Sequence, residues 1–173
     1  MLIWLQRPAD PAMRRVGEFC HQAGQVLTPV ALVAGVRDRF VKLLPGLVVT
    51  FQPKARSLVN LPTLFDTHQP TSLGRPRFVL GGHVITVAGV PQWGFDFGDT
   101  TGGVFDVPGG QYPNQDIAHP YAQQGTFVVT VRTTWVGTFT VDGLGPFAIT
   151  GPNIVQTQTV TVPVKEARAV LVG

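Results

Sequence analysis

From Phe78 onward, apolar and polar residues alternate in short runs that glycine, proline and aspartate separate. Alternation with a period of two, bounded by such residues, is typical of strands joined by tight turns. The pattern predicts strands over 77–80, 83–88, 91–97, 126–135, 138–141, 146–150 and 155–163, with a last run at 168–172. Val136-Gly137 and Asp142-Gly143 are expected to form hairpin turns. We therefore predict a mainly β protein, an immunoglobulin-like sandwich of two packed antiparallel sheets.

The first third of the chain departs from this pattern. Residues 1–28 are interpreted as irregular, with a short helix around 12–20 as the alternative. Thr28-Pro29 then supplies an N-cap followed by proline at the first helical position, and apolar residues recur at helical spacing. A helix is therefore predicted at about 30–44, where Pro45-Gly46 ends it.

Two extended segments, 47–51 and 58–65, lead from this helix to the strands. We predict a basic N-terminal leader over 1–57 and a β-sandwich domain over 58–173. The charge is also uneven along the chain. Residues 1–77 hold ten of the thirteen Lys and Arg and four of the ten Asp and Glu, a net charge of +6, and the remainder carries −3. A basic leader favours an anionic partner or envelope surface, or simply keeps the leader in solution.

Two segments resemble the halves of a PKD domain, a small extracellular β-sandwich. The first is Gln92-Trp93-Gly94-Phe95-Asp96-Phe97-Gly98-Asp99, and the second is Ala118-His119-Pro120-Tyr121-Ala122-Gln123-Gln124-Gly125-Thr126-Phe127. They are similar to the family's W-D-F-G-D-G turn and its H-x-Y-x-x-x-G-x-Y/F-x-V strand. Phe95 stands at the family's tryptophan position, Thr100 replaces a glycine, and an insert separates the halves. Residues 58–63 and 163–172 are also similar to small secreted PKD-domain proteins of high-GC Gram-positive bacteria, a group without an assigned activity.

The residues of this signature are expected to be structural. Strand alternation places the rings of Trp93, Phe95 and Phe97 on the core face of the strand and Asp96 on the opposite face. Aspartate suits the turn that follows, because its carboxylate can accept hydrogen bonds from nearby backbone amides. We expect a buried His119 bonded to the backbone, a buried Tyr121 whose hydroxyl reaches a backbone carbonyl, and a positive φ angle at Gly125. The structural set is Trp93, Phe95, Asp96, Phe97, Gly98, Asp99, His119, Tyr121, Gly125 and Phe127.

No group of residues predicts catalysis. Ser57 and Ser72 are the only serines and lack a G-x-S-x-G context, and His83 and His119 have no third ligand at zinc spacing. We expect no enzyme activity, no metal and no cofactor. Calcium is the one minor alternative, on four aspartates of the signature and the insert: Asp96, Asp99, Asp106 and Asp116.

The insert 100–116 is the candidate binding loop, because it is rich in glycine and proline and would project from a rigid scaffold. Its expected binding residues are Phe105, Asp106, Tyr112 and Asp116. Our first hypothesis is a non-catalytic extracellular module that binds a protein or a cell-envelope component, as in a surface assembly. The second is a carbohydrate-binding module that stacks a polysaccharide on these aromatics, and the third is an accessory domain of a separately encoded hydrolase. Trp93 and Trp135 are expected in the core.

The remaining features narrow the setting. Basic residues stand singly or in pairs without interleaved aromatics, so nucleic acid is not an expected partner. No run of eighteen apolar residues predicts a transmembrane span, and residues 1–5 are too short for a signal-peptide core. A secreted or cell-surface location is therefore implied by the PKD resemblance alone. Cys20 is the single cysteine and is expected to be a free thiol.

Overall fold

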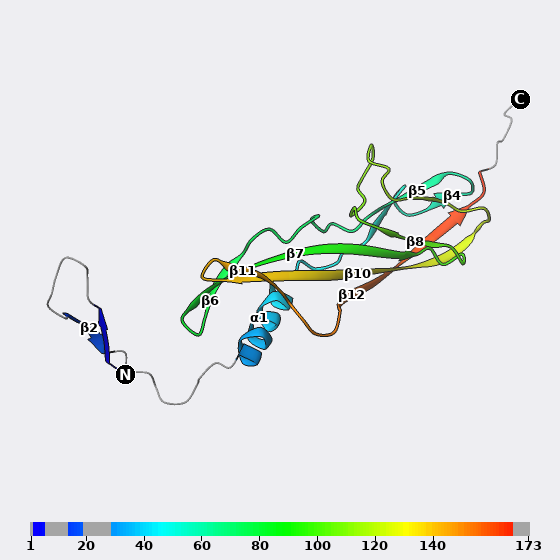
Figure 1. The fold of residues 1–173 in the computed structure, drawn as a ribbon. Helices are drawn as coiled ribbons and strands as arrows, with labels where there is room; N and C mark the ends of the chain where they lie inside the picture. The colour runs from blue at the N-terminus through cyan, green and yellow to red at the C-terminus, as the bar shows by residue number, and fades with distance from the viewer. Residues whose placement is uncertain (1, 6–13, 19–28, 168–173) are drawn as a thin grey trace, which may run out of the picture.

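The computed structural model describes residues 2–5, 14–18 and 29–167 (Figure 1). Strands β1 (Leu2–Leu5) and β2 (Arg14–Glu18) pair antiparallel, so the alternative of a short helix around 12–20 is wrong. Cys20, Thr28 and the predicted run at 168–172 lie outside the described residues.

Helix α1 (Pro29–Leu43) confirms the helix predicted at about 30–44. Val36 and Phe40, one turn apart, are fully buried, as their spacing on one helical face requires. Asp38 and Lys42 lie on the exposed side, where their side chains form an ion pair at 2.9 Å. The helix therefore presents a narrow apolar face to the strands.

The other elements are strands, and they confirm the mainly β prediction. They are β3 (Thr50–Gln52), β4 (Ser57–Leu58), β5 (Pro62–Asp66), β6 (Arg77–Leu80), β7 (His83–Asp96), β8 (Gly102–Phe105), β9 (Ala118–Pro120), β10 (Gly125–Val141), β11 (Leu144–Ala148) and β12 (Ile154–Lys165). A seven-stranded sheet has the order β4-β12-β10-β7-β6, with β11 also on β10 and β8 also on β7. A three-stranded sheet has the order β3-β5-β9. Because β3 pairs with β5, this small sheet includes residues ahead of 58, and the domain division there stays a prediction.

Strands β7 and β10 run unbroken along the large sheet and pair over twelve consecutive residues (Figure 1). The predicted turn at Val136-Gly137 is wrong, because these residues pair with Val90 and Gly89 in the middle of the ladder. The turn predicted at Asp142-Gly143 is confirmed. Both residues have positive φ angles, 48° and 85°, as a two-residue hairpin requires.

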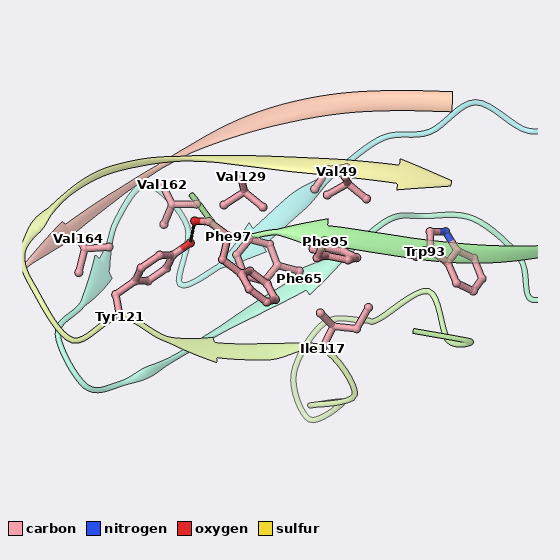
Figure 2. Packing of buried hydrophobic residues seen from close by; sticks show 11 residues of the cluster. Val49, Phe65, Trp93, Phe95, Phe97, Ile117, Tyr121, Val129, Val162 and Val164 are labelled. Carbon is pink, nitrogen blue, oxygen red and sulfur yellow. Dashed lines mark hydrogen bonds between the residues drawn. The ribbon is translucent and has the colours of Figure 1, made fainter. Parts of the chain in front are cut away.

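One face of the large sheet is buried along its whole length, because every second residue of β7 and β10 points to it. The small sheet covers one half of this face, and the rings and aliphatic side chains between the sheets form the core of the sandwich (Figure 2). This core comprises Val49, Phe65, Trp93, Phe95, Phe97, Ile117, Tyr121, Val129, Val131, Val162 and Val164.

Helix α1 covers the other half of the same face. Phe40 lies over a cross-strand pair of glycines, Gly89 and Gly137, whose missing side chains leave room for its ring. A Cβ atom would lie 2.8 Å from the Phe40 ring at the first position and 2.6 Å at the second, closer than atoms pack. The glycine pair is therefore the socket that seats the helix on the sheet.

A buried hydrogen-bond network, which we call the polar seam, joins the half of the sheet face under the small sheet to the half under α1. The buried side chain of Gln69 accepts hydrogen bonds from Trp93 Nε1 (2.9 Å) and Thr133 Oγ1 (2.8 Å) through Oε1. Its Nε2 donates to Gln156 Oε1 (2.7 Å) and to the carbonyl of Pro45 (3.2 Å). The buried side-chain amide of Gln69 thus has all its hydrogen bonds made and is strongly held, because losing any one of them in the protein interior would be costly.

Gln156 extends the seam to the helix side. Its Oε1 also accepts from Trp135 Nε1 (3.1 Å), and its Nε2 donates to the Pro45 carbonyl (2.9 Å) just after α1. Trp93 and Trp135 are thus both in the core, 0% and 3% exposed, with each indole N–H bonded. The sandwich core and the apolar cluster between α1 and the large sheet meet at this network.

We predict that Gly137→Ala lowers the free energy of unfolding by about 1–3 kcal/mol, because the added methyl group forces the buried Phe40 ring to move. Gly94→Ala is the matched control, since a Cβ there meets only a backbone oxygen at 3.8 Å. The control should change stability by less than about 0.5 kcal/mol. Urea unfolding of both variants measures this. Equal losses of stability in the two variants would contradict the role of the glycine pair as the socket for Phe40.

Candidate binding site

The turn that follows β7 is held by the two aspartates of the signature. Asp96 Oδ1 accepts the backbone N–H of Gly98 (3.0 Å), and Asp99 Oδ1 accepts both the backbone N–H (3.1 Å) and the hydroxyl of Thr101. Thr100 has a φ angle of 73°, in the left-handed region that a β-branched residue seldom occupies. The turn thus keeps a glycine-like backbone although threonine has replaced the glycine.

His119 locks this turn to the second half of the signature. Its Nε2 lies 2.7 Å from Asp99 Oδ2, and its ring stacks on Phe97 with ring centroids 4.1 Å apart. The expected backbone partner of His119 is therefore wrong, and its partner is a carboxylate. The Tyr121 hydroxyl donates to the Phe97 carbonyl at 3.2 Å, the bond drawn in Figure 2. Gly125 has no positive φ angle, contrary to expectation, because it opens β10 and pairs with Val164.

The electrostatics of this cluster are those of a structural site. Burial alone would raise the pKa of the Asp99 carboxyl, but hydrogen bonds from Thr101 and His119 outweigh it and hold the pKa below its ordinary value. Burial, with the negative charge of Asp99 nearby, raises the pKa of Tyr121 well above its ordinary value, so its hydroxyl stays a donor. The signature residues fasten the strands to one another, and their polar groups are occupied in doing so.

The part of the insert that follows β8 is tied back onto the small sheet. The carbonyl of Pro108 accepts the backbone N–H of Thr67 (3.0 Å) and its hydroxyl (2.9 Å). Gly109 has a φ angle of 78°, and a Cβ atom there would lie 2.1 Å from the carbonyl oxygen of Phe65. Only glycine fits this approach. The base of the loop is therefore anchored to β5 and the residues just after it.

The tip of the insert folds over the outer face of the small sheet. Gln52 of β3 accepts the backbone N–H of Tyr112 through Oε1 (2.9 Å), and Asn114 donates its backbone N–H to the carbonyl of Gln111 (2.9 Å). Beneath this tip is an open cavity of about 460 Å³ with an almost wholly apolar surface. It is lined by Gln52, Pro53, Lys54, Pro62, Leu64, Tyr112 and Gln115, and we call it the Tyr112 cavity.

Of the four expected binding residues, only Tyr112 lines the cavity, with 74% of its surface exposed. Phe105 is half-buried, and its ring meets Phe95 edge-on at 5.6 Å. Asp106 accepts a hydrogen bond from Gln92 Nε2 (3.0 Å), and Asp116 is exposed. The structure does not bring the four together, and their binding roles stay a prediction.

Sequence reasoning missed the floor and far wall of the cavity. Pro53, Lys54 and Pro62 lie in or between the two extended segments that lead from the helix to the strands, and none was an expected binding residue. Leu64 alternates with the core residue Phe65, yet it is 7% exposed because the insert tip covers the outer side of β5. Nothing in the local pattern signals this, since the covering loop is some fifty residues away in the chain.

The tryptophans and aspartates considered for sugar stacking and metal binding do not form such sites among the described residues. Because Trp93 and Trp135 are buried, neither can stack on a sugar ring beside Tyr112. Within the described residues, no three His, Cys, Asp or Glu side chains gather as a metal ion requires. Of the four aspartates considered for calcium, Asp96 and Asp99 bond within the β7 turn, Asp106 accepts from Gln92, and Asp116 is exposed.

No protein-family model matches the chain, and no curated protein matches it either. A solved structure does: the solution structure of the PKD domain of the human VPS10 domain-containing receptor SorCS2. The two are 19% identical, and the match covers 73% of this chain and 77% of that one, with a TM-score of 0.42. At this distance no property of the receptor is carried to this chain.

The narrower resemblance to secreted proteins of Gram-positive bacteria stays a prediction. Among the described helices, none is long and apolar enough to cross a membrane.

We predict that Asp99→Asn lowers stability at pH 7 by about 1–2 kcal/mol, because the charge-assisted bonds from Thr101 and His119 weaken. The pKa of Asp99 is lowered in the folded state, so its contribution is fully present above the ordinary value of 3.8 and is lost as the pH falls through the folded value. The gap between variant and wild type should therefore close in acid.

Urea unfolding at several pH values from neutral to acid measures this gap. Asp116→Asn is the control, since its carboxylate is exposed and accepts no hydrogen bond among the described residues. A gap for Asp99→Asn that stays constant or widens in acid would contradict the assignment.

Proposed function

We propose that this chain is a non-catalytic extracellular module of PKD type that binds a protein segment in the Tyr112 cavity. The observation that carries the proposal is a preformed apolar cavity under an anchored loop, on a scaffold whose other polar clusters are structural. Apolar cavities with a few placed polar groups are where proteins hold ligands. The extracellular setting rests on the resemblance of the two signature halves to PKD domains.

The chemistry of the lining favours a peptide with an apolar anchor. Two proline rings and a tyrosine ring offer flat apolar surfaces, and Gln52 and Gln115 add amide groups to the lining. Lys54 is the one charged side chain of the lining, so a carboxylate next to the anchor would be favoured. Lys54 and Tyr112 are also the only titratable groups there, which supports binding rather than catalysis.

A carbohydrate remains the second candidate, because Tyr112 is an exposed ring beside amide groups. It is the weaker one. Phe105, the other aromatic residue expected to stack on a sugar, packs against Phe95 instead. The roles of surface-assembly subunit and of hydrolase accessory domain rest on the sequence alone.

We predict that Tyr112→Ala weakens peptide binding at least about ten-fold, because an exposed tyrosine over an apolar cavity is the kind of residue that dominates binding. Peptides would be selected from a random library on the immobilised chain and then titrated by NMR. The expected result is enrichment of an apolar residue next to Asp or Glu, with shifts at Leu64, Tyr112 and Gln115.

Val90→Ala is the control, since Val90 is exposed on the open face of the large sheet, and it should bind like the wild type. Peptides whose shifts map elsewhere, or whose affinity survives Tyr112→Ala, would overturn the proposal. Shifts at the cavity with soluble polysaccharide and none with peptide would establish the carbohydrate alternative instead.

A further inference from the structure

Strand β12 forms a long free edge of the large sheet. It pairs with β10 over eleven consecutive residues without a bulge, but with β4 only at Val164 and Lys165. The stretch 154–163 thus has a strand on one side only, among the described residues. Free edges expose unpaired backbone groups, which are templates for another strand.

The register shows which backbone groups face outward. The carbonyl of Lys165 accepts the backbone N–H of Val59 (3.0 Å), on the side away from β10. Because backbone groups alternate sides along a strand, those of Thr161, Thr159 and Thr157 point the same way. Outside the ladder with β10, none of the three has a backbone hydrogen bond to another described residue.

This edge also lacks the features that usually protect one. Its residues 154–162 include no proline and no charged residue, and Pro163 comes only at the end. The opposite edges of the large sheet are short by comparison: β6 and β8 have four residues each, and β6 carries Arg77. An uncharged, regular edge of this length favours pairing with another strand.

We propose that β12 pairs antiparallel with β12 of a second copy of this chain, with Thr159 on the two-fold axis. The sequence Thr157-Gln158-Thr159-Val160-Thr161 is nearly symmetric about its centre. The same patch then serves both copies, as a two-fold interface requires. Thr157 of one copy faces Thr161 of the other, and each such pair exchanges two backbone hydrogen bonds.

The side chains on both faces of the edge fit this pairing. All three threonines are exposed on the open face, and cross-strand Thr–Thr pairs are favourable. On the inner face, Gln158 Oε1 is a buried acceptor without a hydrogen-bond partner among the described residues. Buried acceptors are rarely left unpaired. The Gln158 of the second copy lies diagonally across the axis, within reach of a long side chain, and its amide supplies a donor.

The surface fits a second copy better than an unrelated partner. No charge on this edge selects an oppositely charged protein, whereas its symmetry makes it complementary to itself. Strand pairing alone buries little surface, so the dimer should be weak, with a dissociation constant in roughly the micromolar range. The pairing does not depend on the Tyr112 cavity.

A charge-swap experiment tests the axis directly. Residue 159 meets itself in the dimer, so Thr159→Lys and Thr159→Glu should each weaken the dimer about ten-fold or more by placing like charges opposite each other. An equimolar mixture of the two variants should restore dimer formation to near the wild-type level. Val136→Lys, an exposed position of the open face away from the edge, should leave the dimer unchanged. Sedimentation over a concentration series measures all four samples, and melting curves show that each variant is folded.

The second readout is amide hydrogen exchange. Protection at Thr157, Thr159 and Thr161 should rise with concentration in the wild type and stay low in Thr159→Lys. A wild-type chain that is monomeric up to about 1 mM overturns the proposal. So does a dimer that both charged variants retain, or one in which these three amides stay unprotected, because the contact would then lie elsewhere.

Discussion

The buried side chain of Gln69 makes four hydrogen bonds that tie three strands of the large sheet to the residues just after α1. One sheet face carries two different coverings, a small sheet over one half and helix α1 over the other, and Gln69 is bonded where they meet. The same short segment also reaches the insert, because Thr67 holds Pro108 from two residues away. The loop over the Tyr112 cavity and the packing of the sheet are therefore fixed by neighbouring residues of one chain segment.

This arrangement separates structure from binding. In the PKD-like signature, the side chains of Asp96, Asp99 and His119 hold the β7 turn and join the two halves of the signature. The two surfaces that we propose for partners are the cavity on the outer face of the small sheet and the free edge of β12. If both proposals hold, a dimer presents two cavities, and a partner with two binding segments gains affinity by avidity.

The sequence predicted what depends on local pattern. Strand alternation placed Trp93, Phe95 and Phe97 on one buried face, and helical spacing found Val36 and Phe40. It failed where a residue acts through distant contacts. Gly137 looked like a turn residue because glycine ends many strands, yet it lies inside β10 as part of the socket for Phe40. The local pattern around Gln69 assigns it no role, because its burial depends on partners from four other segments.

The most direct test of this account is native-state amide hydrogen exchange along the β7–β10 ladder. If the Gln69 seam joins both cores into one cooperative unit, amides near Val87, under the helix, and near Phe95, in the sandwich, should exchange with the same limiting free energy of opening. A helix half that opens at a free energy lower by several kcal/mol would contradict this coupling, because the two coverings would then be independent units that share a sheet.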